Sequence, residues 1–164
     1  MQDDEKKIKK RSERMIKLLD ASKGKGMKDF PAPPFTKWLN GKVMSVKRGE
    51  IEFEYDVRPE MANPTGLLHG GMQAAILDET IGVMSSTLGY EGFLISIDLH
   101  IDYLGKVKVG EKIRAISKII RDGRHIVHAI SEIYDSDGNL IATGNSNLLK
   151  TQYKTDYSKF KNRA

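Results

Sequence analysis

The sequence predicts an α+β domain in which a curved, mostly antiparallel sheet wraps around one central helix, with an extra helix near the N-terminus. Two observations support this fold class. The run Met72–Leu88 is apolar nearly all round, and segments with alternating apolar and polar residues flank it on both sides. A helix of that kind belongs in the interior of a protein. One sheet covers only one side of it, so we expect a second copy of the chain to close the other side.

The composition describes one globular domain with an extension. The chain has 164 residues, of which 39% are hydrophobic and 30% charged, and it shows no run suited to a membrane span or a secretory signal. It has no cysteine, which excludes disulfides, thiolate metal sites and cysteine nucleophiles and favours the reducing cytoplasm.

The net charge of +5 is concentrated near the N-terminus, because residues 1–29 hold ten Lys and Arg against six Asp and Glu. No aromatic residues alternate with these basic ones, as base stacking would require. We therefore expect a solvated basic helix there and no nucleic-acid partner.

The N-terminal elements follow from local patterns. Residues 4–21 predict a helix with a partial apolar stripe, and the glycines and prolines of residues 22–34 predict a linker or strap. Phe35–Asn40 suits a short helical turn, and strands are expected at Val43–Val46 and Ile51–Val57.

The segments after the central helix predict further strands. The first is Phe93–Tyr103, where Ile95 and Ile97 should face one way and Ser96 the other. Residues 112–121 and 124–134 meet at an Asp-Gly turn, which is typical of a hairpin, and Leu140–Lys150 completes the sheet. The expected organisation is a basic extension at 1–32, the main domain at 33–150 and a polar tail at 151–164.

The central helix also carries groups that suit hydrolysis. Asp78 lies well inside the apolar run, and such a carboxylate is expensive to bury unless it is paired or used. No Lys or Arg occurs between Met72 and Leu88, so any basic partner must come from elsewhere in the fold. Gly70 and Gly71 precede the run and leave backbone N–H groups at the positive end of the helix. The glycine pair alone also fits a simple tight loop.

These residues belong to a recognisable pattern. Asn63-Pro64-x-Gly66-x-x-His69-Gly70-Gly71, then Leu77-Asp78 and Gly82, resembles the PaaI-like branch of the hotdog-fold acyl-CoA thioesterases. The resemblance covers roughly residues 33–150 and leaves the basic N-terminal extension outside. It implies the hotdog fold, a dimer or dimer of dimers, and hydrolysis of an acyl-CoA thioester to the free acid and CoA.

The resemblance also implies roles for individual residues. Asp78 is the general base or nucleophile, and the N–H groups of Gly70 and Gly71 form the oxyanion hole. Asn63, His69 and Ser96 match polar positions that hold the thioester or the water. Asn63 equally suits an Asn-Pro turn, His69 a structural loop histidine and Ser96 an ordinary strand residue.

Coenzyme A carries phosphate groups, so its binding site should be basic. The predicted hairpin supplies candidates in Arg121, Gly123, Arg124 and His125, and Tyr103 is a further one. Solvated hairpin charges are the alternative reading. CoA would be part of the substrate, so we expect no separate cofactor. We expect no metal either, because His125 and His128 should point to opposite faces of a strand.

The spacing on the helix adds a constraint of its own. Gly71 and Asp78 lie seven residues apart, on nearly one face but separated by about 10 Å of helical rise. Reacting groups must approach to about 3–3.5 Å, so one copy of the helix cannot place both on one carbonyl. Two antiparallel copies can, which predicts a site shared between subunits.

Two other functions compete with this prediction. One is a non-catalytic acyl-CoA-binding or regulatory hotdog protein, in which the basic extension contacts a partner. The other is a hotdog dehydratase, although its pairing of a histidine with an acid is not evident here. The sequence contains no G-x-S-x-G elbow, P-loop or dinucleotide fingerprint.

Overall fold

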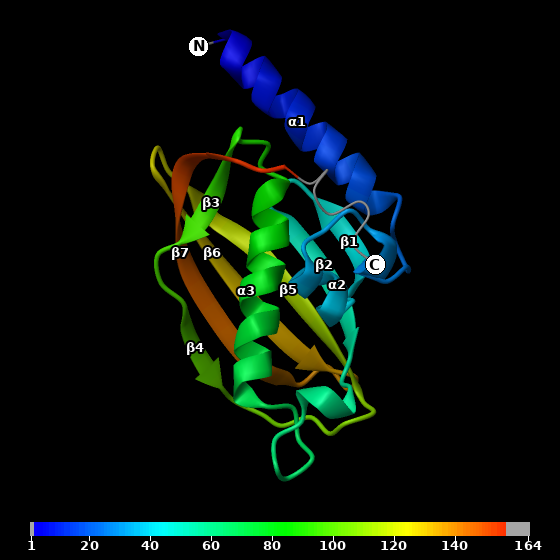
Figure 1. Cartoon of the computed structure of the whole chain (residues 1–164). Coiled ribbons are helices and arrows are strands. Elements are labelled where there is room, and N and C mark those ends of the chain that lie inside the picture. Colours follow the sequence, from blue (N-terminus) through cyan, green and yellow to red (C-terminus); the bar gives the residue numbers. More distant parts are fainter. Residues whose placement is uncertain (1, 157–164) are drawn as a thin grey trace.

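The computed structural model describes residues 2–156 (Figure 1). The α-helices are α1 (Gln2–Asp20), α2 (Pro34–Leu39) and α3 (Gly70–Ser86), and the short 3-10 helices are η1 (Met27–Asp29) and η2 (Pro59–Met61). The strands are β1 (Lys42–Lys47), β2 (Glu50–Asp56), β3 (Gly92–Ser96), β4 (His100–Tyr103), β5 (Lys112–Asp122), β6 (Ile126–Asp135) and β7 (Leu140–Lys154).

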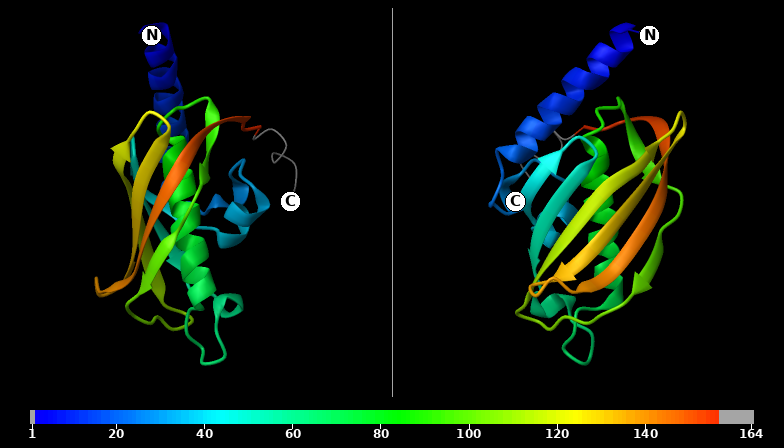
Figure 2. Two further views of the ribbon diagram at one scale, coloured as in Figure 1. Left: turned by 90° about the vertical axis from the view of Figure 1, so that its left-hand side faces the viewer. Right: turned by 180° about the vertical axis from the view of Figure 1, so that it is seen from behind.

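The strands form one antiparallel sheet in the order β1-β2-β5-β6-β7-β3, and β4 also pairs with β7. The sheet curves around α3, which lies across its concave face (Figures 1 and 2). This is the predicted α+β architecture of a sheet wrapped around a helix. β7 runs on to Lys154, past the predicted end of the domain at Lys150. The remainder of the predicted tail, from residue 157, lies outside the described residues.

The strand predicted at Phe93–Tyr103 is two strands, and this prediction was wrong. The chain leaves the sheet at residues 97–99, where the Asp98 carboxylate accepts hydrogen bonds from the backbone N–H (2.9 Å) and side-chain amide (2.8 Å) of Asn147. Leu94 of β3 is buried, whereas Ile95 and Ile97 are both exposed. The sequence pattern gave no sign that a polar side chain replaces ladder hydrogen bonds here.

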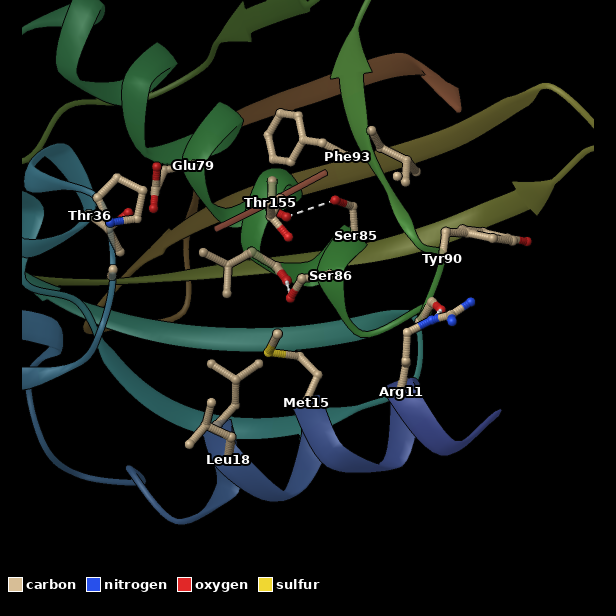
Figure 3. Close-up of a pocket in the computed structure, with 18 of the residues that line it drawn as sticks. Arg11, Met15, Leu18, Thr36, Glu79, Ser85, Ser86, Tyr90, Phe93 and Thr155 are labelled. Atoms are coloured by element: carbon tan, nitrogen blue, oxygen red, sulfur yellow. Dashed lines mark hydrogen bonds between the residues drawn. The ribbon is translucent and has the colours of Figure 1, made fainter. Parts of the chain in front are cut away.

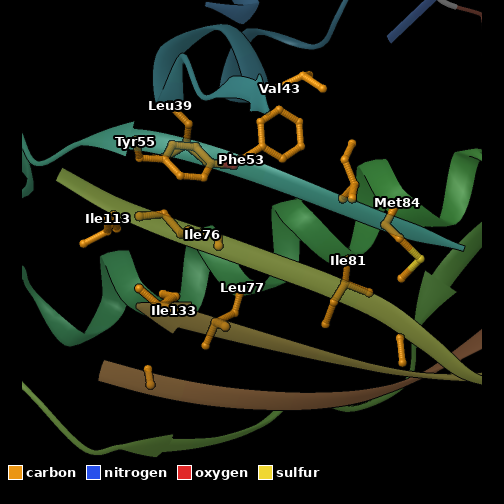
Figure 4. Close-up of a cluster of buried hydrophobic side chains, with 14 of the residues drawn as sticks. Leu39, Val43, Phe53, Tyr55, Ile76, Leu77, Ile81, Met84, Ile113 and Ile133 are labelled. Atoms are coloured by element: carbon orange, nitrogen blue, oxygen red, sulfur yellow. The ribbon is translucent and has the colours of Figure 1, made fainter. Parts of the chain in front are cut away.

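The helix α3 has two different faces. Ile76, Leu77, Ile81 and Met84 recur at helical spacing and are fully buried against the sheet (Figure 4). Burial of each such side chain contributes about 1.5–3 kcal/mol. The opposite face of α3 is lined mainly by small residues. We expected a helix in the interior that is buried on all sides, and this was wrong for a single subunit, in which only the side of α3 that faces the sheet is fully buried.

The N-terminal segment packs on the side of α3 that the sheet leaves open. In Figure 2 (left) the sheet and α2 lie on opposite sides of α3. The contact of α1 with the body is polar at its centre: Ser12 Oγ donates to the carbonyl of Thr87 (2.6 Å) and Arg11 Nε to that of Gly89 (2.8 Å). Leu19, near the end of α1, is buried in the core.

Gly89 combines two constraints at this contact. Its φ is +80°, and an added Cβ would overlap the backbone of Ile8 and Ser12 in α1. Gly66 has a similar φ of +78°, but a Cβ there would meet open space. Only glycine adopts such a conformation without strain.

We predict that Gly89→Ala lowers the free energy of unfolding more than Gly66→Ala does. The positive φ costs about 1–2 kcal/mol in both variants, whereas only Gly89→Ala must also displace α1. Urea denaturation of the two variants measures the difference. Equal losses would show that α1 does not depend on close approach at Gly89.

Candidate functional site

The loop before α3 is organised by Asn63. Its side-chain oxygen accepts hydrogen bonds from the backbone N–H of Thr65 (3.0 Å) and Leu67 (3.1 Å) and from the Thr65 hydroxyl (2.7 Å). This geometry is the turn-forming alternative considered for Asn63. Its amide nitrogen makes no hydrogen bond within residues 2–156, so the side chain keeps two free donors for a ligand.

His69 is the N-cap of α3. Its ring Nδ1 accepts a hydrogen bond from the backbone N–H of Gly71 at 2.8 Å, and its carbonyl accepts from Met72 and Gln73. Because Nδ1 is the acceptor, the ring proton of a neutral His69 lies on Nε2. His69 therefore satisfies the helix N-terminus, as capping residues do.

This cap corrects the predicted oxyanion hole. The N–H of Gly71 is already bound to His69, so it is not a free donor in this chain. The N–H of Gly70, at the first position of the helix, has no hydrogen-bond acceptor in the described part of the chain. Of the glycine pair, only Gly70 presents an unused donor at the positive end of α3.

Asp78 lies on the open face of α3 and is exposed to solvent, so the expectation of an apolar environment was wrong for a single chain. Its Oδ1 accepts a hydrogen bond from Ser96 Oγ at 3.1 Å, which brings two of the predicted site residues together. Both line a shallow cleft of about 510 Å³ between α3 and the β3–β4 segment. Gly71 lies in the same cleft, with Ala74 and Ala75 between it and Asp78.

Tyr103 lies at the other end of this face. A Cβ added to Gly70 would come within 3.4 Å of the Tyr103 ring, so the ring covers the first turn of α3. The side chain is 54% exposed, which leaves much of it available to a ligand. Tyr103 and Gly70 thus form one group at the N-terminus of α3, separate from the Asp78–Ser96 pair.

The β5–β6 hairpin does not join either group within one chain. Asp122 accepts a hydrogen bond from Tyr90, four residues past the C-terminal end of α3, and forms a salt bridge of 2.7 Å with Lys150. The hairpin therefore lies at the far end of α3 from Gly70. One chain cannot gather all five predicted CoA-binding residues: Tyr103 is at one end, and Arg121, Gly123, Arg124 and His125 are at the other.

Asp122 also changes the charge of the hairpin, which the sequence analysis missed. Burial alone would raise the pKa of Asp122, but hydrogen bonds from Lys150 and Tyr90 lower it below its ordinary value. The carboxylate is thus ionised and offsets part of the positive charge of Lys150 and Arg48 beside it. The side chains of Arg121, Arg124 and His125 stay exposed.

A second and larger cleft opens on the other side of Asp78. It has a volume of about 1020 Å³ and lies between α3, β3 and the N-terminal segment (Figure 3). Glu79 lies in its wall, half-buried and hydrogen-bonded to Thr36 of α2. Burial raises the pKa of Glu79, and the charge of Asp78 adds to this while Thr36 opposes it. The strap residues 30–33 line the same cleft, so the surroundings of Glu79 depend on the path of the strap.

Two further findings concern metals and membranes. Within residues 2–156, no group of three or more His, Asp or Glu side chains is placed to hold a metal ion. None of the helices in the same range is both long and apolar enough to cross a bilayer.

Comparison with known proteins agrees with this fold. The chain is 29% identical to mouse acyl-coenzyme A thioesterase 13 over 119 residues, which cover 70% of this chain and 84% of the relative. The Escherichia coli PaaI protein superposes with a TM-score of 0.73 at 14% identity, covering 90% of this chain and 98% of its own. A Streptococcus mutans protein solved with acetyl CoA has a TM-score of 0.66 at 19% identity, covering 71% and 92%.

The sheet wrapped around α3 and these structural neighbours define a hotdog-fold protein. The model of the thioesterase superfamily matches residues 65–142, which run from the loop before α3 into β7. Over these residues the chain is similar to this superfamily, and it shares its fold with the PaaI proteins.

We predict a pH-dependent stability effect of Glu79. Its pKa is raised above 4.5 in the folded state, so the cost of the buried charge is absent below pH 4.5 and develops as the pH rises through the raised value. Glu79→Gln should therefore gain thermal stability over the wild type at pH 7 and little or none at pH 4. The control Glu13→Gln, on exposed α1, should show no such gain. A pH-independent difference would contradict the burial of this charge.

Proposed function

We propose that the protein is an acyl-CoA thioesterase that hydrolyses the thioester to a carboxylic acid and CoA. The observation that carries this proposal is the pairing of an exposed carboxylate, Asp78, with Ser96 on the face of α3 whose N-terminus presents the free N–H of Gly70. The match of residues 65–142 to the thioesterase superfamily supports it. So do a relative named as an acyl-coenzyme A thioesterase and a structural neighbour solved with acetyl CoA.

The chemistry requires a nucleophile and a donor for the developing oxyanion. Asp78 either removes a proton from the attacking water or attacks the thioester carbonyl itself. In the first case the C–S bond then breaks, the thiolate of CoA leaves, and the proton taken up from water returns to it. In the second case the C–S bond breaks as a mixed anhydride with Asp78 forms, and water then hydrolyses the anhydride, which releases the acid, restores the carboxylate and supplies a proton to the thiolate. Ser96 holds one carboxylate oxygen, which fixes the orientation of the other toward the water or the carbonyl. The Gly70 N–H stabilises the oxyanion at the helix N-terminus.

One chain cannot complete this arrangement. Gly70 and Asp78 are eight residues apart on α3, which separates them by about 12 Å along the axis. The site therefore takes Asp78 from one subunit and Gly70 from its partner. The second subunit would also bring its own hairpin toward the first, which offers Arg121 and Arg124 to the nucleotide of CoA across the interface.

The surface of the chain supports such a dimer. β3 pairs with β7 on one side only, so its second edge has unpaired backbone groups. Beside this edge Ile95 and Ile97 are 40% and 58% exposed, which is unusual for isoleucine on a free surface. Pairing of two β3 edges would continue the sheet across the subunits and cover these side chains.

We predict that Asp78→Asn lowers kcat for acyl-CoA hydrolysis by a factor of about 10²–10⁴, the range for loss of a proton-transfer group. A thiol-release assay with acetyl, octanoyl, phenylacetyl and benzoyl-CoA measures it. Asp102→Asn, an exposed aspartate of β4, is the matched control and should stay within a factor of about two, the scale of ordinary surface substitutions. Full activity of Asp78→Asn would refute the mechanism. No turnover of any ester by the wild type would favour an acyl-CoA-binding role instead.

The shared site can be tested at Gly70. Gly70→Pro removes the proposed donor at a position where helices accept proline, and His69 (φ −61°, ψ 139°) has the extended backbone that must precede one. We predict that kcat falls about 10²–10³-fold, as for loss of an oxyanion donor. Gly70→Ala keeps the N–H and should lose much less.

Mixed dimers of Gly70→Pro and Asp78→Asn subunits should recover part of the activity, because one of their two sites is then intact. Heterodimers verified by mass spectrometry that remain as inactive as the parents would argue against a shared site.

A further inference from the structure

The larger cleft extends from the Asp78–Ser96 pair along the second half of α3. The residues of α3 that line it recur on one face of the helix, and the line ends at Gly89. Eight residues separate Asp78 from Ser86, the last residue of α3, which corresponds to about 12 Å of helical rise, and the chain leaves the helix before Gly89. Since Asp78 and Ser96 line both clefts, this space is continuous with the proposed reaction centre.

Much of the wall of the cleft is apolar, although Arg14, Thr36 and Glu79 also line it, and its serines are satisfied within the helix. The hydroxyl of Ser85 donates to the carbonyl of Gly82 (2.7 Å), and that of Ser86 donates to Val83 (2.6 Å). Both hydroxyls are therefore satisfied inside the helix and require no polar ligand. Across the cleft, Phe93 of β3 is 44% exposed and adds an aromatic surface (Figure 3).

The outer wall is built by the N-terminal segment. Met15 and Leu18 of α1 point toward the cleft, and the strap adds Phe30 (Figure 3). Leu18 is 44% exposed although it lies on a helix that packs against the body. This segment lies outside the match to the superfamily, which begins at residue 65.

The charged groups at the far end of the cleft already have partners. Arg11 donates to the carbonyl of Gly89 at 2.8 Å, and Glu91 forms a salt bridge of 3.1 Å with Lys154. An apolar ligand extending from Asp78 would therefore run toward a solvated rim. Near Asp78 it would pass the carboxyl group of Glu79, which is hydrogen-bonded to Thr36.

Gly82 deepens the cleft at its centre. It lies one helical turn beyond Asp78, and a Cβ added to it would meet no atom within 4 Å. A glycine inside a helix is less favourable than alanine by about 1 kcal/mol, and here it leaves the cleft open. A larger side chain at this position would project into the cleft without displacing the fold.

We propose that this cleft binds an extended aliphatic acyl chain of medium or long length, and that α1 and the strap form the wall that sets the chain length. The inference rests on the proposed thioesterase function, because it assigns the acyl group of that substrate. A single aromatic ring would fill only the part of the cleft next to Asp78. An unbranched chain matches both the elongated shape of the cleft and the apolar part of its lining. The volume of the cleft is at the upper end of the range for small-molecule sites.

Binding of free fatty acids tests the inference without catalysis. Isothermal titration of the wild type with acetate, octanoate, dodecanoate and hexadecanoate should show affinity rising about fourfold per added methylene until the cleft is full. Gly82→Phe should bind dodecanoate at least tenfold more weakly than its matched control Gly82→Ala, which restores helix propensity but adds only a methyl group. In the hydrolysis assay, the ratio of kcat/KM for dodecanoyl-CoA to that for acetyl-CoA should fall in the same variant.

A second pair of variants tests the N-terminal wall. Leu18→Asp places a charge at the cleft and should weaken dodecanoate binding at least tenfold, whereas Lys17→Asp, on the exposed side of α1, should not. Folded Gly82→Phe and Leu18→Asp proteins with the wild-type dependence on chain length would overturn the inference. Hydrolysis of acyl-CoA without any such dependence would overturn it and leave the proposed function standing. Fatty-acid binding with the expected dependence on chain length, but without hydrolysis of any acyl-CoA, would overturn the proposed function and leave the apolar binding site standing.

Discussion

The packing of α3 against the sheet is the constraint on which the other features depend. Ile76, Leu77, Ile81 and Met84 commit one face of the helix to the core, and this fixes the direction in which the other face points. Asp78 and Gly82 are directed outward as a result, one helical turn apart on that face. Both clefts, and the contact with the N-terminal segment, are built on this second face. A rotation of α3 would therefore alter all of them together.

Much of the fold could be predicted because the local pattern and the tertiary packing agree. The hairpin at Asp122-Gly123 and the helix after the glycine pair carry strong local signals, and the structure has both. The break between β3 and β4 could not be predicted. It depends on the contact of Asp98 with Asn147, which lies 49 residues away in the chain. The alternation of apolar and polar residues continues through the break, so periodicity alone predicts one continuous strand there.

The candidate site likewise has features that the sequence predicts and features that it does not. The pairing of Asp78 with Ser96 fits the roles that the motif implies, and the separation of Gly70 from Asp78 follows from helix geometry alone. The capture of the Gly71 N–H by His69 was missed, because a histidine is a less familiar N-cap than serine or aspartate. The position of Glu79 was missed for another reason. Its surroundings come from a strap of glycines and prolines whose path the sequence does not determine.

The cap at His69 has a consequence for how the proposed substrate would be held. With His69 Nδ1 occupied by the Gly71 N–H, the free donor at the end of α3 is the backbone N–H of Gly70, which carries no formal charge. Dipoles of this kind act over a short range, whereas the exposed guanidinium groups of Arg121 and Arg124 act through solvent and are screened beyond about 8 Å at physiological salt. The thioester carbonyl and the phosphates of CoA would thus be attracted by forces of different reach. Ionic strength would govern the arrival of the nucleotide and leave the polarisation of the carbonyl almost untouched.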